Sequence, residues 1–250
     1  MATLSQGASP WSQRVLTGRN SLLDRYFYFA MSFLIAGLVV WGFSHTVDAN
    51  LFHAAVPRPL LLWIHGAAFS AWVVFYILQS ALVRTRNVRV HRSLGWFGLA
   101  LGACMVLLGF TIAVIMGHFD IYTLHLPMAD TEAFLAIPFY DMLAFGTLLG
   151  LAIYWRRKPE LHRRLLFLAT CSLLDAAFGR VDYIFNNHIF FVFVDSVIAL
   201  GIVRDLLVNR TIHPVYRYAL PVLVVAQTVT TLLWSHPPQW WLSVTHAILS

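Results

Sequence analysis

The sequence is poor in charge. Asp, Glu, Lys and Arg make up 11% of its 250 residues, whereas hydrophobic residues make up 59%. A soluble globular domain carries about 25% charged residues, so this composition excludes an ordinary water-soluble protein. Cysteine is also scarce: the two cysteines, Cys104 and Cys171, both lie inside apolar stretches. They provide neither a disulfide framework nor a CxxC metal-binding pair.

Long hydrophilic linkers are lacking as well, so the chain is predicted to form one bundle. We expect a polar cytoplasmic segment over residues 1–25, a single transmembrane domain over residues 26–236 and an outer tail over residues 237–250. Trp240 and Trp241 favour an interfacial position for that tail, because tryptophan is enriched at membrane interfaces.

Long apolar runs are what the sequence has in abundance. Each run is near the roughly 20 residues that span a bilayer as a helix. The expected fold class is therefore an all-α, polytopic transmembrane bundle of about seven helices. The predicted spans are residues 26–43, 60–83, 94–117, 133–155, 165–184, 189–203 and 218–234.

The basic residues cluster in alternate loops between these runs. Arg86 follows the second run, Arg157 the fourth and Arg210 the sixth, whereas the opposite loops carry acidic residues such as Asp48 and Asp130. Lys and Arg are retained in cytoplasmic loops, so the N-terminus is predicted inside and the C-terminus outside, in a cell inner membrane. This distribution accounts for the formal net charge of +6 as a topology signal and argues against nucleic-acid binding.

A histidine marks the predicted cytoplasmic start of each odd-numbered helix after the first. Such helix starts present unpaired N–H groups that can dock an anion. These positions could hold a phosphate or a lipid headgroup, or they could serve only as interfacial anchors and orientation signals. The residues concerned are His91, Arg92, His162, Arg163 and His213.

Several of these patterns resemble a family of bacterial multi-pass proteins known only as predicted membrane proteins. The resemblance implies a bacterial inner-membrane protein and no particular activity. It rests on His65-Gly66 with Trp72 and Gln79, on His91-Arg92 with Leu94-Gly95-Trp96, on residues 156–165 and on Asp205 with Arg210 and His213-Pro214.

Ionisable residues inside predicted spans are costly and therefore indicate function. At ~1.5 Å per residue they lie roughly 6–13 Å below the outer helix ends, so we expect them to line one acidic cavity. Such a cavity would bind or translocate a proton or a small polar ligand, with Arg180 paired to Asp195 or Asp141 and His65 relaying protons. The candidate residues are His65, Asp141, Asp175, Arg180, Asp195 and Gln227.

Three alternatives remain open from the sequence. One is a membrane oxidoreductase with a b-type haem or a divalent metal, held by His65 or by His91 and His162. Another is an accessory or assembly subunit of a membrane complex, in which the buried charges only fix helix register. Gly98 and Gly102 form a GxxxG pattern, so a homo-oligomer or a partner helix could also pack on that face.

Overall fold

The computed structural model describes residues 18–250, with side chains from residue 22 onward, so most of the predicted segment 1–25 lies outside the described residues. The described part of the chain is all helical and contains no strand. Its elements are α1 (Gly18–Ser44), the short π-helix η1 (Asp48–Phe52), α2 (Leu60–Arg84), α3 (Val88–Tyr122), α4 (Met128–Phe134), α5 (Ala136–Tyr154), α6 (Pro159–Ser172), α7 (Asp175–Phe178), α8 (Asp182–Asn186), α9 (Phe190–Asn209), α10 (Pro214–Ser235) and α11 (Gln239–Leu249).

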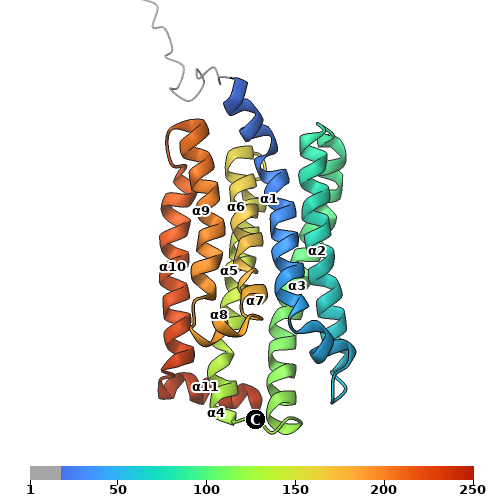
Figure 1. Cartoon of the computed structure of the whole chain (residues 1–250), viewed down its shortest axis with the longest axis vertical. Coiled ribbons are helices and arrows are strands. Elements are labelled where there is room, and N and C mark those ends of the chain that lie inside the picture. Colours follow the sequence, from blue (N-terminus) through green and yellow to red (C-terminus); the bar gives the residue numbers. More distant parts are fainter. Residues whose placement is uncertain (1–17) are drawn as a thin grey trace, which may run out of the picture.

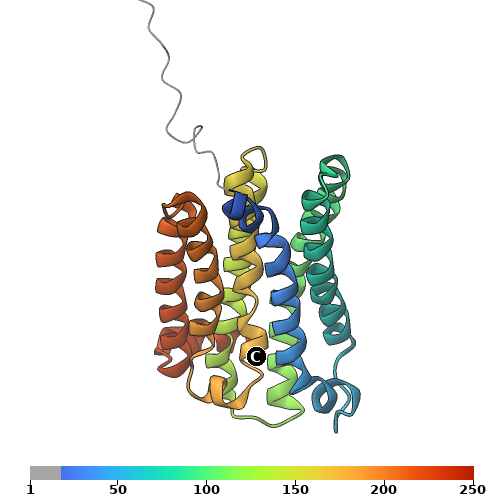
Figure 2. The same cartoon turned by 45° about the horizontal axis from the view of Figure 1, so that its top comes forward.

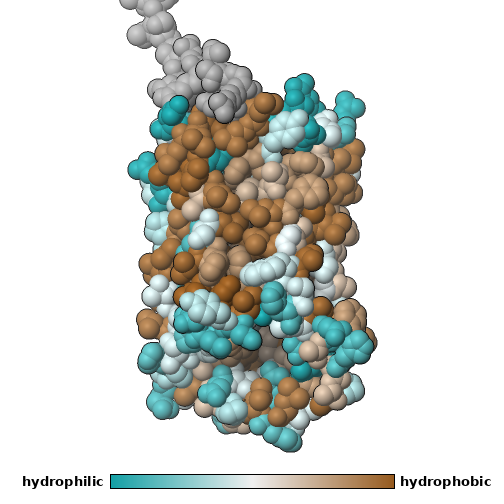
Figure 3. Space-filling model, in the orientation of Figure 1, coloured by the Kyte–Doolittle hydropathy of each residue, from teal (hydrophilic) through white to brown (hydrophobic). Residues whose placement is uncertain are grey.

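Five helical segments are long and apolar enough to cross a membrane. They are Leu22–Ser44, Leu60–Arg84, Val88–Tyr122, Met128–Tyr154 and Pro214–Ser235. The other two predicted spans differ in kind: α6 has only 14 residues, and α9 contains Asp195, Arg204 and Asp205. In Figure 3, apolar side chains form a broad band across the face shown, and hydrophilic ones gather toward its two ends. This surface is the one that a protein in a bilayer presents to lipid.

The helices form a bundle with α5 and α6 in its middle. In Figures 1 and 2 the α9–α10 pair and the α2–α3 pair lie on opposite sides of α1, α5 and α6. The loops after α2, α5 and α9 lie at one end of the bundle, here called the basic end, while α4 and α11 lie at the other. Buried side chains such as Phe145, Phe167 and Leu168 fill the space between these layers.

Proline sets the start of many of these helices. Pro159 and Pro214 occupy the first turns of α6 and α10, where a missing N–H costs nothing. Pro59, Pro127 and Pro238 stand immediately before α2, α4 and α11. Of the predicted spans, the one beginning at residue 60 starts where α2 does, whereas α6 and α10 begin four to six residues before the predicted starts at residues 165 and 218.

Two of the predicted spans are broken in the structure. The run 133–155 is divided at Leu135, between α4 and α5, and Pro138 lies in the first turn of α5, where it is tolerated. The run 165–184, predicted as one helix, is divided into α6, α7 and α8. A tight turn replaces the helical ladder where Leu174 N–H donates to the Cys171 carbonyl. As a result Ser172, Asp175, Gly179 and Asp182 do not share the single helix face expected from their spacing.

The predicted outer tail is the helix α11. It packs across the end of the bundle against α4. His246 Nδ1 lies 2.8 Å from the carboxylate Oε1 of the buried Glu132, which fastens the two helices together.

The closest approach between α1 and α7 depends on Gly42. A methyl group on Gly42 would lie 2.8 Å from the Ala177 Cα and would also overlap its carbonyl oxygen. Because backbone cannot move aside as a side chain can, Gly42→Ala should destabilise the fold by about 1–3 kcal/mol, the usual cost of overpacking. Thermal unfolding in detergent measures this difference.

Gly37→Ala is the matched control, since Gly37 lies in the same helix with nothing within 4 Å of an added methyl. We expect it to unfold at or slightly above the wild-type temperature because alanine favours helix. Equal unfolding temperatures for the two variants would contradict the close contact of α1 and α7.

Candidate functional site: a buried carboxyl pair and a lateral groove

Asp141 and Asp175 form a pair of carboxyl groups inside the bundle. Asp141 extends from α5 and Asp175 is the first residue of α7, and their exposed fractions are 7% and 2%. The two groups are close enough for a proton on one to be shared with the other. Apart from the two carboxyl groups themselves, no described side chain donates to Asp141 Oδ1 or to the carboxyl group of Asp175, which the N–H groups of Asp175 and Ala176 approach at the start of α7. The sequence predicted that both side chains line one cavity, and the structure brings them side by side inside the bundle.

Gln227 and Tyr140 connect this carboxyl pair to a third acid, Asp195. Gln227 Nε2 donates a hydrogen bond of 3.1 Å to Asp195 Oδ1. Tyr140 lies within electrostatic reach of all three carboxylates and beside Gln227. Its hydroxyl group is buried beside Gln227 and can donate to a nearby acceptor. We call the residues Tyr140, Asp141, Asp175, Asp195 and Gln227 the acid cluster.

Sequence reasoning did not find Tyr140. The signal that could have found it is its position next to Asp141 at the start of a buried helix, with Pro138 immediately upstream. A phenol among carboxyl groups supplies a proton donor that the three aspartates, when ionised, lack.

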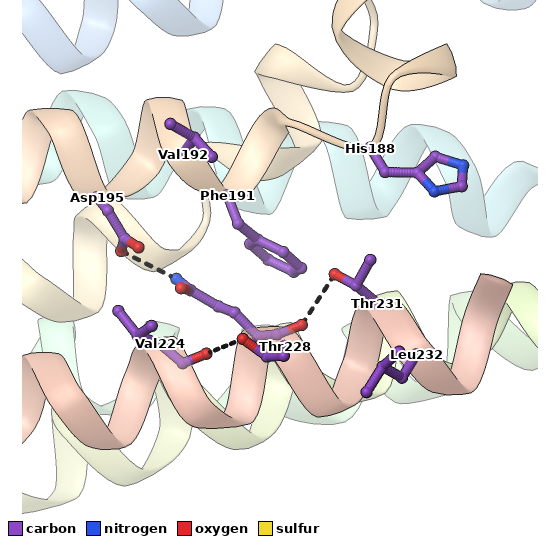
Figure 4. Close-up of a pocket in the computed structure, with 9 residues that line it drawn as sticks. His188, Phe191, Val192, Asp195, Val224, Thr228, Thr231 and Leu232 are labelled. Carbon is purple, nitrogen blue, oxygen red and sulfur yellow. Dashed lines mark hydrogen bonds between the residues drawn. The ribbon is translucent and has the colours of Figure 1, made fainter. Parts of the chain in front are cut away.

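A groove between α9 and α10 leads to the acid cluster from the side of the bundle. Its volume is about 260 Å³, and Figure 4 shows Asp195 extending toward it from α9 and Thr228 and Thr231 from α10. Both threonine hydroxyls already donate to backbone carbonyls of α10, so only their acceptor lone pairs remain. His188 lies at the rim, with its ring centroid 4.3 Å from that of Trp234. The groove is thus mainly apolar, and the carboxylate of Asp195 and the two threonine hydroxyls provide hydrogen-bond acceptors in it.

The other two expected members of the cavity lie apart from the acid cluster. The guanidinium group of Arg180 lies over the Phe43 ring, 5.0 Å from its centroid, and makes no ion pair with a described residue. The expected pairing of Arg180 with Asp195 or Asp141 is therefore wrong. The His65 ring packs on the Phe69 ring, with their centroids 4.1 Å apart, and His65 interacts electrostatically with Arg180. The predicted cavity thus divides into an acid cluster and a separate His65–Arg180 group beside α1.

A second polar cluster lies near the basic end and was not predicted. Arg164 and Asp205 are both fully buried and form a two-bonded pair, with Arg164 Nε donating to Asp205 Oδ2 at 2.9 Å and Nη2 to Oδ1 at 2.5 Å. Arg204 pairs with the same carboxylate at 2.6 Å and also with Asp24 of α1. We call this set the Arg–Asp network: Asp24, Glu160, Arg163, Arg164, Arg204 and Asp205.

The Arg–Asp network balances its charges and ties three helices together. It contains three arginines and three carboxylates, drawn from α1, α6 and α9. Burial on its own would raise the pKa of Glu160, but Arg163 and Arg164 lower it overall, so the carboxylate stays ionised at neutral pH. Arg164 had been interpreted from the sequence as part of a topology signal. Its spacing of three and four residues from the buried Phe167 and Leu168 could have shown that it faces inward.

The predicted anion or headgroup residues have different surroundings. Arg163 is engaged by Glu160 at 2.7 Å, and the His213 ring accepts a hydrogen bond from the Val215 N–H as the N-cap of α10. His91 and His162 approach each other at the basic end, their ring centroids 6.3 Å apart, while Arg92 is exposed. Of these five residues, Arg92 is the one whose side chain is exposed.

The glycines of the GxxxG pattern face the inside of the bundle. A methyl on Gly98 would meet the Phe75 ring, and one on Gly102 would meet Leu149 and Trp72. These small residues therefore let α3 pack closely against α2 and α5. Association with a second copy or a partner chain stays a prediction, and this face is already occupied within the chain.

No group of three or more His, Cys, Asp or Glu side chains is arranged to hold a metal ion within residues 18–250. The sequence and the structure were also compared with known proteins. No protein-family model, no curated protein and no solved structure matches this chain. The function must therefore be inferred from the site itself.

The Arg–Asp network gives a stability prediction. Asp205→Asn leaves Arg164 and Arg204 buried with their main countercharge gone, and breaking a buried pair costs about 3–5 kcal/mol. We expect a large fall in the unfolding temperature of the purified protein. Asp130→Asn is the control, because Asp130 is exposed and should change the unfolding temperature little. A small shift for Asp205→Asn would contradict the assigned pairing.

Proposed function

We propose that this chain is a multi-pass inner-membrane protein that binds or translocates a proton, or a small polar ligand that takes its place, at the acid cluster. The observation that carries the proposal is the contact between Asp141 and Asp175, neither of which forms an ion pair with a described cation. Two ionised carboxylates side by side in a dry interior repel each other and lack hydration. A proton shared between them satisfies both groups at once.

The groove supports an exchange route to this proton. Asp195 is only half buried, and it is joined through Gln227 to the neighbourhood of Tyr140 and the carboxyl pair. A proton or a small hydrogen-bond donor entering at Asp195 would meet acceptors along the whole way. Intramembrane acids arranged in such a series are typical of proton relays.

The orientation of the chain is part of the same proposal. The basic end carries Arg86, Arg157 and Arg210, and the positive-inside rule favours a cytoplasmic position for it. With α6 to α8 crossing as a broken segment and α9 as a full helix, the chain would pass through the membrane seven times. The N-terminus would then be inside and α11 outside. A reporter fused after Ser250 that is active only outside the cytoplasm tests this placement.

Proton flux into liposomes tests the function. Purified protein is reconstituted with a pH-sensitive dye inside, and a potassium gradient with valinomycin drives protons inward. We expect the wild type to acidify the lumen faster than protein-free liposomes do. Asp141→Asn and Asp175→Asn should return the rate to the protein-free level, because an amide cannot carry the proton.

Asp130→Asn is the matched control, an exposed aspartate at the same end of the bundle, and should keep the wild-type flux. Each variant is first checked for its unfolding temperature, and asparagine keeps the size of the buried side chain. Equal flux in the wild type and in Asp141→Asn would contradict translocation through the acid cluster. It would favour the alternative of a purely structural, accessory subunit.

A further inference from the structure

His91 and His162 form a pair that the proposed function does not use. His91 lies in the first turns of α3 and His162 in the first turn of α6, so the loops before these two helices bring them together at the basic end. Their ring centroids are 6.3 Å apart and the ring planes are inclined by 73°. Both side chains are half buried.

Each of these rings has its Nδ1 atom already engaged by a carbonyl oxygen. His91 Nδ1 lies 2.5 Å from Gln79 Oε1, and His162 Nδ1 lies 2.8 Å from the Ala152 carbonyl. A carbonyl oxygen only accepts, so both Nδ1 atoms donate their hydrogen. This leaves the Nε2 atom of each ring as the one with a free lone pair. Histidines that bind metals are fixed in this way, by a second oxygen partner on the other ring nitrogen.

The separation of the rings fits one metal atom between them. A metal–imidazole bond is about 2.0–2.1 Å, and a ring nitrogen lies about 1.1 Å from its ring centroid, so two opposed imidazoles have centroids about 6.2–6.4 Å apart. The observed separation is 6.3 Å. The inclination of the rings is free in such an arrangement, because each ring can turn about its own metal–nitrogen bond.

The number of protein ligands and the positive charge around His91 and His162 indicate which kind of metal centre this site can hold. The described residues provide no third His, Cys or carboxylate for this site, whereas zinc takes four ligands. Arg92 acts on His91 electrostatically, and Arg156 lies nearby over the ring of Trp96 in the same helix as His91. Cationic surroundings repel a bare metal ion but attract the carboxylates of an anionic cofactor.

We propose that His91 and His162 are the two axial ligands of a b-type haem at the basic end of the bundle. The macrocycle would supply the remaining iron ligands, and Arg92 and Arg156 are the nearby cations that would neutralise its propionates. Gln79 and the Ala152 carbonyl act as positioning groups for the two rings. His65 takes no part, because it lies 14 residues from Gln79 in α2, about 21 Å along that helix.

Haem titration of the purified full chain in detergent tests this site. We expect the wild type to bind one haem with the absorption spectrum of a six-coordinate, bis-imidazole iron. His91→Ala and His162→Ala should each lose that spectrum. Gln79→Leu should weaken binding about 10- to 100-fold, as removal of an outer partner does at other metal sites. His118→Ala is the control, because His118 lies in the same helix about 40 Å away and should bind as the wild type does.

Loss of binding through misfolding is separated by chemical rescue. Free imidazole added to His91→Gly should restore the six-coordinate spectrum, which a general loss of structure would not allow. Absence of a bis-imidazole spectrum in the wild type overturns the proposal, and so does tight binding of copper(I) without haem. Asp141→Asn should keep the haem spectrum. The haem site and the proposed proton function are therefore tested independently of each other.

Discussion

The contact between Asp141 and Asp175 is the constraint on which the account of this protein depends. In an apolar bundle a polar group cannot exchange a protein partner for water, so each buried group must be satisfied by a neighbour. These two carboxyl groups have no countercharge, since no described cation forms an ion pair with either of them. Their mutual proximity makes sense physically only when a proton, or a donor in its place, lies between them.

The Arg–Asp network shows how the same bundle treats charge that is purely structural. Arg164 and Asp205 are fully buried, but they meet in a two-bonded pair and share further partners on α1 and α6. Every charge there has a countercharge, and the result is a fixed junction of three helices. The acid cluster lacks such compensation. Arg180, the one cation expected to balance it, stacks on Phe43 instead. This contrast is the reason for assigning function to one cluster and structure to the other.

The sequence predicted the helices better than it predicted their contacts. Apolar runs of about 20 residues marked α2, α3, α5 and α10, because the length of an apolar run is a local property of the sequence. The break between α6 and α7 was not predictable in this way, since the residues around Leu174 are as apolar as any helix interior. Likewise, depth along each helix indicated a common level for Asp141 and Asp175, but it could not indicate that Arg180 would turn toward α1. Which side a buried arginine takes depends on packing between helices that are distant in the chain.

The most direct test of the account is the protonation state of the carboxyl pair itself, observed by infrared difference spectroscopy of wild type against Asp141→Asn and Asp175→Asn at neutral pH. The account predicts that the wild type shows the C=O stretch of a protonated carboxylic acid, that this band shifts in heavy water, and that each substitution removes or moves it. A wild-type spectrum with only ionised carboxylate bands, unchanged by either substitution, would contradict the shared proton and with it the proposed function.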